Sequence, residues 1–329
     1  MLYDGGAEDW TTDDVQSVLE PVRAVAAVLR RARHRVQRVA VRPGLDWLDA
    51  VRSAEVVYNL CEGIGGISHL EYKVASAIEL AAVPYTGANA WSMTVCHRKP
   101  VLNALLAAAG LPVPDWASVT PDDDVDGFPL PALVKPAAED ASVGIDQGSV
   151  VTTHAALRAR IAQLGANFSE IMVQRYIHGR ELAVGIVGER LLPISEIDFS
   201  DMPADAWPIL SFAAKWTPGS AEDAGSQPVC PANVPPRLAE ELEDLARRAW
   251  RAVRGEGYAR VDFRVDEAGR PWILEVNPNP DISTDAGLAR MARAGGWSYS
   301  DMVLAILSEV LARQASAPAS TSEAGRVQA

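Results

Sequence analysis

The chain has 329 residues with a formal net charge of −13, and 48% of the residues are hydrophobic while 22% are charged. This length allows two or three subdomains with sizeable cores, and the acidic balance without a visible basic face argues against a nucleic-acid partner. No apolar run reaches the roughly 18 to 20 residues that cross a bilayer, and the first residues lack a basic segment followed by an apolar one, so we expect a cytoplasmic protein without a membrane partner.

Helix and strand patterns alternate through the first third of the chain. An apolar stripe predicts a helix over residues 13–33, and strands are predicted at 34–41 and 54–60. A further helix over 71–82 leads to a short strand, "VPYTG", at 83–87. Strands separated by helices predict a parallel sheet with crossover connections. Only "MLYD" precedes the first helix, which is short for an opening strand, so the sequence leaves open a start upstream of Met1.

The middle and last thirds have longer loops. A helix predicted over about 98–109 ends at Gly110. The strand "LPALVKPA" follows and carries Lys135, and the loop "AEDASVGI" then leads towards the strand "EIMVQRYI". Residues 200–235 are rich in Pro, Ser, Ala and Asp with little periodicity, which predicts a long ordered loop or lid before a helix over 236–254. The closing residues "ASAPASTSEAGRVQA" are small and polar and predict a disordered tail.

The segment "RVDFRVDEAGRPWILEVNPNP", residues 260–280, predicts a β-hairpin with unusual polar positions. If Glu267–Arg270 form the turn, the antiparallel register places Asp262 opposite Glu275 and Arg260 opposite Asn277, all on one face. Two carboxylates about 5 Å apart would destabilise a sheet. A divalent cation removes this repulsion, and Mg²⁺ prefers carboxylate and amide oxygens. The alternative is that both carboxylates simply face solvent.

Several segments in chain order resemble the ATP-grasp superfamily, in its D-alanine:D-alanine ligase-like branch. They cover roughly residues 54–310 and read "EVVYNLCEG", "VPYTG", "HRKPVLNALLAAAGLPVP", "ALVKPAAEDASVGI", "MVQRYIHGRELAV", "FAAKW", "CPA" and "YARVDFRVDEAGRPWILEVNPNPDIS". The resemblance implies an α/β fold with a parallel-sheet N-terminal domain over 1–91, a central ATP-grasp subdomain over 92–185, a C-terminal subdomain with the lid over 186–312, and the tail over 313–329. It also implies ATP bound between the central and C-terminal subdomains, two Mg²⁺ ions with Mn²⁺ as a substitute, and ligation of a carboxylate to an amine through an acyl phosphate.

The same resemblance implies roles for individual residues. Phosphates would be bound by Lys99, Lys135, Ser142, Val143 and, from the lid, Lys215; an unpaired Lys135 would otherwise be costly in its apolar strand. The adenine and ribose would be bound by the hinge residues Gln174, Arg175 and Ile177 and by Glu181. Mg²⁺ would be bound by Asp262, Glu275 and Asn277. Catalytic roles would fall to Arg260, which would stabilise the acyl phosphate and the oxyanion, and to Lys215 and Ser142.

The chain departs from the dipeptide ligases where they bind their substrates. Asp140-Ala141-Ser142 replaces a glycine followed by two serines, and Trp216 replaces the lid tyrosine. Asp281 stands where these ligases have a glycine, and Glu62 where they usually have a histidine. Glu62, Asp281 and Glu196 would bring carboxylates towards two pockets that hold small neutral side chains, which favours a cationic or strongly hydrogen-bonding substrate. The alternatives are that Asp281 caps the next helix and that Glu62 pairs with Lys73 or another local cation.

We therefore predict an ATP-dependent carboxylate–amine ligase that joins small-molecule substrates, expected to be amino acids other than two D-alanines. The alternatives are a genuine D-alanine–D-alanine ligase and a nucleotide-binding protein of this fold without ligase turnover. A homodimer is compatible with the sequence.

Overall fold

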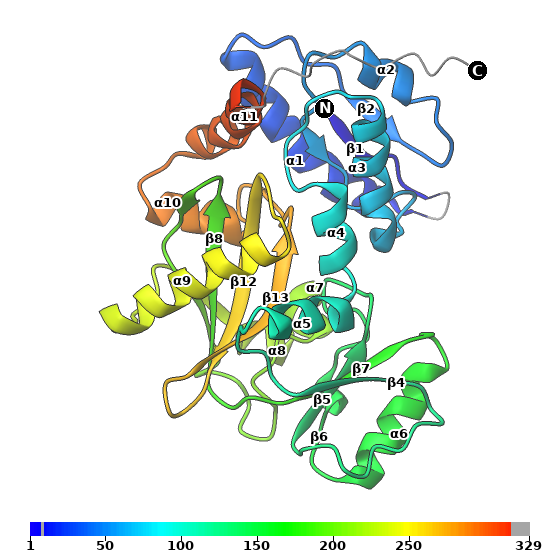
Figure 1. Ribbon diagram of the computed structural model, residues 1–329, viewed down its shortest axis with the longest axis vertical. Coiled ribbons are helices and arrows are strands. Elements are labelled where there is room, and N and C mark those ends of the chain that lie inside the picture. Colours follow the sequence, from blue (N-terminus) through cyan, green and yellow to red (C-terminus); the bar gives the residue numbers. More distant parts are fainter. Residues whose placement is uncertain (8–9, 317–329) are drawn as a thin grey trace, which may run out of the picture.

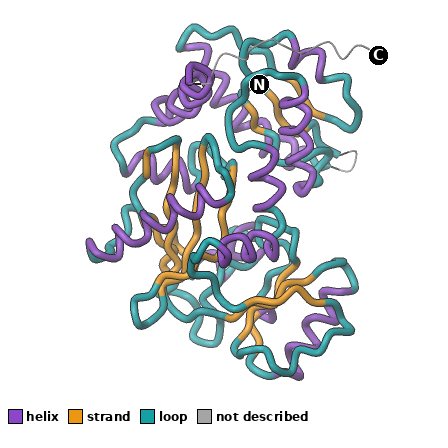
Figure 2. Tube along the Cα trace, viewed as in Figure 1, coloured by secondary structure: helices purple, strands orange, loops and turns teal. Residues whose placement is uncertain are grey.

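The computed structural model describes residues 1–7 and 10–316, and its backbone forms three bodies stacked along the longest axis (Figure 1). The N-terminal body lies at one end, a body built on a large sheet lies in the middle, and a smaller sheet covered by one helix lies at the other end. Figure 2 shows that loops and short helices fill the junction between the two sheets. Among the described residues, every helix is too short or too polar to span a bilayer.

The N-terminal body contains the predicted parallel sheet, but its strands are shorter than expected. Their order is β2-β1-β3, and both pairings are parallel. The central strand β1 is formed by Leu2–Asp4, the residues that seemed too short for a strand, because it pairs on both sides. The predicted strand at 83–87 is reduced to one bridge between Val57 and Tyr85. The elements of this body are β1 (Leu2–Asp4), α1 (Thr12–Arg31), β2 (Val39–Val41), α2 (Leu48–Arg52), β3 (Asn59–Leu60), η1 (Ser68–Leu70) and α3 (Glu71–Leu80).

The body formed by the middle of the chain is the smaller sheet at the end of the molecule, a four-stranded antiparallel sheet with the order β4-β7-β5-β6. Helix α6 covers one face, because Leu157, Ile161 and Leu164 pack with Val134 and Val173 in one core. Two helices connect this body to the first, and α5 begins at Lys99. Its elements are α4 (Ala90–Cys96), α5 (Lys99–Ala108), β4 (Trp116–Val119), β5 (Ala132–Pro136), η2 (Gln147–Ser149), β6 (Val150–Val151), α6 (His154–Gly165) and β7 (Ile171–Arg175).

The C-terminal body is a six-stranded antiparallel sheet with the order β11-β10-β8-β12-β13, in which β9 also pairs with β8. Helix α9 packs on one face of β8, β12 and β13, and Leu182, Phe263 and Ile273 are fully buried there. The elements are β8 (Arg180–Val187), β9 (Arg190–Leu191), β10 (Ser195–Asp198), α7 (Phe212–Trp216), α8 (Ala221–Ala224), β11 (Gln227–Val229), α9 (Pro236–Ala252), β12 (Tyr258–Val265), β13 (Pro271–Pro278), α10 (Gly287–Ala294) and α11 (Tyr299–Ser316).

Two expectations for this body need correction. The segment 200–235 is not a continuous loop, since it contains α7, α8 and β11. The tail does not begin at 313, because α11 continues to Ser316 and packs against α1 of the N-terminal body; the rest of the predicted tail, 317–329, lies outside the described residues.

The hairpin register predicted at the polar positions is confirmed: Arg260 pairs with Asn277, and Asp262 pairs with Glu275. The pairing is achieved differently, however. The connection spans residues 266–270, one residue more than predicted, and a β-bulge between Asp262 and Phe263 restores the register. The bulge also puts Ile273 rather than Leu274 into the core with Val276.

Candidate active site

Charged side chains gather on the hairpin face opposite α9. Arg260 donates from Nε and Nη2 to the two oxygens of Asp262, at 2.7 and 2.8 Å, and Asn277 Nδ2 donates to Asp262 Oδ2 at 2.7 Å. Lys99 Nζ lies 3.6 Å from Glu275 Oε1. The charge of Asp262, opposed by burial, raises the pKa of Arg260 above its usual value. Cations from the chain itself therefore offset the repulsion between the two carboxylates that the register brings opposite each other.

Three lysines approach this face from different elements. Lys99 is the first residue of α5 and is buried, and its Nζ also lies 3.2 Å from Asp140 Oδ1. Burial lowers the pKa of Lys99, but the charges of Glu275 and Asp140 outweigh burial and raise it. Lys135 on β5 is only 6% exposed and forms no ion pair within the described part of the chain, and burial lowers its pKa to about 8 against the attraction of Glu275. Desolvation and then the charge of Arg260 lower the pKa of Lys215 on α7. The three lysines form a basic wall facing the carboxylates.

The loop 140–145, here named the phosphate loop, contacts the lid segment 207–216. Ala141 and Ser142 both have positive φ values, 53° and 62°. The Ser142 hydroxyl donates to the Leu210 carbonyl at 2.7 Å, and the Trp216 indole N–H donates to the Ala141 carbonyl at 2.9 Å. Trp216 therefore donates to the backbone of Ala141, the residue that replaces a serine of the dipeptide ligases. The Ser142 hydroxyl must break its hydrogen bond to Leu210 before it can donate to a ligand.

The predicted hinge begins with the last two residues of β7 and continues into the connection to β8. Gln174 is 1% exposed, and its Nε2 has no hydrogen-bond partner in the described structure, which leaves a buried donor available to a ligand. The Arg175 side chain points elsewhere, with its guanidinium 4.7 Å from the Trp272 ring centre, whereas Ile177 is buried. Glu181 Oε2 accepts from Arg264 Nη2 at 2.8 Å.

Val143, on the phosphate loop, donates its backbone N–H to the Asp140 carbonyl.

A small pocket lies where the N-terminal body meets the end of β13. Glu62 is exposed at this pocket and makes no ion pair with any described residue; Lys73 lies over Tyr72 instead. Desolvation, followed by the charges of Asp281 and other carboxylates, raises the pKa of Glu62 to about 8. The lining residues are Pro21, Asn59, Leu60, Cys61, Glu62, Tyr258, Asn279, Pro280, Asp281 and Ile282.

Two further residues define the polarity of this pocket. Asn59 is 1% exposed, and its Nδ2 finds no acceptor among the described residues. Asp281 Oδ1 accepts from the backbone N–H and the hydroxyl of Ser283, at 2.7 and 2.6 Å. The alternative that Asp281 caps the next helix is wrong, because α10 begins at Gly287 and its N-cap residue is Ala286. The pocket thus combines carboxylate acceptors with one buried, unused amide donor.

The structure does not bring Glu196 to this site. Glu196 pairs with Leu182 in the sheet, and Leu182 pairs with Phe263, so their side chains share the face opposite Asp262. Both carboxylate oxygens of Glu196 accept from Arg180 at 2.6 Å. The prediction that Glu196 contributes an unpaired carboxylate to the substrate region is therefore wrong.

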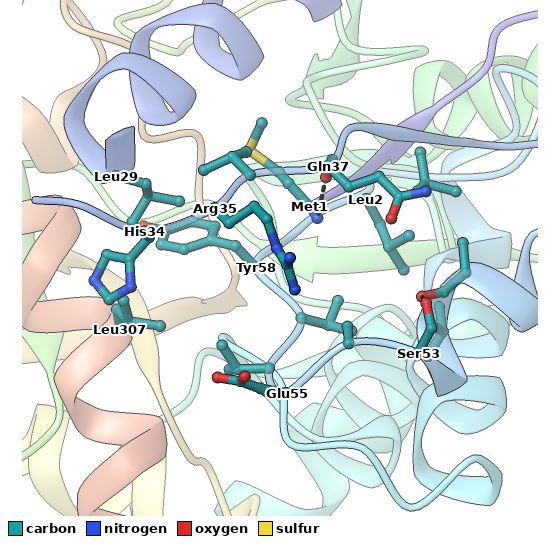
Figure 3. Close-up of a pocket in the computed structure, with 17 residues that line it drawn as sticks. Met1, Leu2, Leu29, His34, Arg35, Gln37, Ser53, Glu55, Tyr58 and Leu307 are labelled. Atoms are coloured by element: carbon teal, nitrogen blue, oxygen red, sulfur yellow. Dashed lines mark hydrogen bonds between the residues drawn. The ribbon is translucent and has the colours of Figure 1, made fainter. Parts of the chain in front are cut away.

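A larger pocket of about 490 Å³ lies beside Met1 in the N-terminal body (Figure 3). Its walls come from segments 34–39 and 50–58 together with Leu307, and the Met1 amine donates to the Gln37 carbonyl at 2.9 Å. None of the predicted site residues lines this pocket, so it is separate from the charged cluster.

Beside Lys99, the buried His97 and Glu71 form a polar group with Asn279 that was not predicted from the sequence. No periodicity marks these residues, and the resemblance assigns them no role. The one available signal was the placement of His97 two residues before Lys99 in "CHRKP".

The chain is similar to known proteins in both sequence and fold. The family model described as D-ala D-ala ligase C-terminus matches residues 105–308. A D-alanine–D-alanine ligase of Gluconobacter oxydans is 33% identical over 296 residues, which cover 88% of this chain and 93% of that protein. The D-alanine–D-alanine ligase of Bacillus anthracis complexed with ATP has a TM-score of 0.76 at 21% identity, with 95% of this chain and 97% of that chain covered. The VanG D-Ala:D-Ser ligase of Enterococcus faecalis has a TM-score of 0.75 at 19% identity, with 94% and 98% covered.

Proposed function

The chain belongs to the D-alanine–D-alanine ligase family and has its ATP-grasp fold, and we propose that it ligates a carboxylate to an amine whose side chains differ from those of two D-alanines. Membership in the family makes it a carbon–nitrogen bond-forming enzyme that uses ATP. The observation that carries the substrate proposal is the pocket at Glu62, where an unpaired carboxylate lies with the buried, unused amide donor of Asn59.

The nucleotide proposal rests on the basic wall facing the hairpin. Lys99 and Lys135 would bind the phosphates of ATP, and Lys215 would bind the γ-phosphate from the lid. Lys135 supports this role because a buried cation without an ion pair is costly unless a ligand supplies the anion. The free Nε2 of Gln174 supports adenine binding at the hinge, next to the backbone groups of Arg175 and Ile177. Glu181 and the phosphate loop, with Ser142 and Val143, would complete the nucleotide site.

The residues Asp262, Glu275 and Asn277 fit a hard cation. The described residues hold no cluster of three or more His, Cys, Asp and Glu side chains arranged for a metal. Mg²⁺ needs only one or two carboxylates from the protein, however, because phosphate and water complete its shell. When bound, Mg²⁺ (or Mn²⁺) would supply positive charge to the phosphates. The chain prepares this position by placing two carboxylates and an amide on one face of the hairpin.

The reaction needs charge stabilisation more than covalent participation by the protein. A substrate carboxylate oxygen attacks the γ-phosphorus and ADP leaves, which gives an acyl phosphate; the amine then attacks the acyl carbon, phosphate leaves, and the amine loses a proton. Arg260 is held on Asp262 through two of its nitrogens, and its Nη1 has no hydrogen-bond partner among the described residues. That free donor would stabilise the acyl phosphate and the oxyanion of the second step.

The substrate class follows from the pocket. A neutral small side chain would leave Glu62 with only water as a partner and would leave the buried Asn59 Nδ2 without an acceptor, and an unpaired buried polar group is costly. A side chain with an ammonium, guanidinium or amide group can donate hydrogen bonds to Glu62. A side chain that also carries an oxygen can accept a hydrogen bond from Asn59 Nδ2. We therefore propose an amino acid with a cationic or strongly hydrogen-bonding side chain for this pocket.

The test is a screen of amino acids of both chiralities, singly and in pairs, with ATP and Mg²⁺, in which ADP release is measured and products are identified by mass spectrometry. We expect products that contain an amine-bearing or amide-bearing side chain. Efficient dipeptide formation from D-alanine alone, with kcat/KM at or above about 10⁴ M⁻¹s⁻¹, would contradict the substrate proposal.

A further inference from the structure

His97 is the C-cap residue of α4 and lies buried between two carboxylates from distant parts of the chain. Its Nε2 is 3.0 Å from Glu71 Oε2, and its Nδ1 is 2.6 Å from Asp140 Oδ2. An ionised carboxylate only accepts hydrogen bonds, so an imidazole that meets one at each nitrogen carries a proton on both. Burial lowers the pKa of His97, but Asp140 and Glu71 outweigh burial and raise it to about 10. The two carboxylates therefore favour the protonated form of the buried imidazole.

Each carboxylate makes a second contact that leads away from His97. Asp140 Oδ1 lies 3.2 Å from Lys99 Nζ, and Asp140 is the first residue of the phosphate loop. Glu71 Oε1 accepts from Asn279 Nδ2 at 3.1 Å, and Asn279 lines the pocket that contains Glu62. Asn279 is fixed in turn, because its Oδ1 accepts from the Ala88 N–H at 2.7 Å. One path of polar contacts therefore joins the phosphate loop to the substrate pocket.

We propose that His97 is a positioning residue, which holds the phosphate loop and Lys99 in place relative to the substrate pocket through its contacts with Asp140 and Glu71. The inference rests on the proposed binding of ATP phosphates by Lys99. It deepens the proposed function, because neither the family resemblance nor the comparisons assign a role to this histidine.

Two physical consequences follow from removing His97. Asp140 is followed by Ala141 and Ser142 at positive φ, a strained conformation that persists only when the surrounding structure fixes it. Asp140 would also keep Lys99 as its remaining cationic contact, so that its full charge would compete with phosphate for that lysine. Both effects act on phosphates and leave the adenosine site at Gln174 unchanged.

The test compares Mg-ADP with adenosine as ligands of the full chain by isothermal titration calorimetry. The variants are His97→Gln, Glu71→Gln, their double variant, and His34→Gln as a control at an exposed histidine of the N-terminal body. We expect His97→Gln to weaken Mg-ADP by about 10-fold or more, the scale of one charge-assisted contact, while the affinity for adenosine changes by less than about twofold. The double variant should lose no more than His97→Gln alone, because both substitutions interrupt one path.

Equal losses for Mg-ADP and adenosine, unchanged Mg-ADP affinity, or additive losses in the double variant would overturn the inference. If His97→Gln does not fold, Glu71→Gln decides the question by the same comparison of the two ligands. Turnover is scored separately. A wild-type chain that binds Mg-ADP but joins no amino acids contradicts the proposed ligase and leaves this test valid, whereas a wild-type chain that binds no Mg-ADP overturns both.

Discussion

Arg260→Lys separates charge stabilisation during the reaction from nucleotide binding. Arg260 uses Nε and Nη2 to hold both oxygens of Asp262, and its Nη1 lies 3.8 Å from the position that a Cβ on Gly287 would take. An ammonium group cannot hold both oxygens and also present a third donor in a fixed direction. Since one oxyanion donor is typically worth a factor of about 10² to 10³ in kcat, we expect turnover to fall by that amount.

The same geometry predicts a limited loss of stability. One charge-assisted hydrogen bond to Asp262 is lost, which costs roughly 1.5 to 3 kcal/mol and lowers Tm by several degrees. The assay is ADP release at saturating ATP, Mg²⁺ and the best amino-acid pair, together with calorimetric titration of Mg-ADP and thermal unfolding. Arg270→Lys is the matched control, because Arg270 pairs with Asp266 at 3.0 Å in the exposed turn of the same hairpin. Normal turnover with a large loss of nucleotide affinity would refute the reasoning and move Arg260 to the nucleotide site.

Three further outcomes are expected. Glu275→Gln should reduce turnover by about 10² or more at saturating Mg²⁺ with little change in Tm without nucleotide, because Lys99 keeps Asp140 as a partner; near-normal turnover would remove Glu275 from the metal site. Glu62→Gln should lower kcat/KM for cationic amino acids by about 10-fold relative to neutral ones, as measured by competition with mass-spectrometric detection, and an unchanged ratio would exclude Glu62 from substrate recognition. Because the folded pKa of His97, about 10, lies above its usual value of 6.5, its stabilising contribution is complete below pH 6.5 and is lost as the pH rises to about 10. Urea unfolding should therefore show that the free energy of unfolding of the wild type falls by up to about 4 kcal/mol over this pH range relative to that of His97→Gln. A difference in free energy of unfolding that stays constant with pH would contradict a raised pKa.

The sequence predicted the hairpin well because two independent signals agreed there. Alternation and turn residues fixed the strands, and the polar positions then marked one face. The pairing of Asp262 with Glu275 was right even though the turn length was wrong, because the bulge compensates for the extra turn residue. No pattern in the sequence predicts such a bulge, so the sequence does not indicate that Ile273 rather than Leu274 is buried.

Other features depend on contacts between distant segments and could not be predicted. Glu196 looked available because its partner Arg180 is 16 residues away on the neighbouring strand. His97 is a lone histidine in sequence, and its protonated form is favoured only when α3 and the phosphate loop supply Glu71 and Asp140. The strand at Leu2–Asp4 was underestimated because its stability comes from partners on both sides rather than from its own length.

The return of α11 to the N-terminal body has a consequence for how the protein is made. Met302, Val303 and Ile306 of α11 share one core with Val25 and Val28 of α1. On the ribosome, α1 is synthesised early, but its apolar side stays exposed until α11 has been synthesised near the end of the chain. Pairing between segments so far apart slows folding, because the entropy of closing the intervening loop is lost before the contact forms. The apolar side of α1 is therefore buried only after the end of the chain has been made, although the core around the sheet of the same body needs no residue beyond Tyr85.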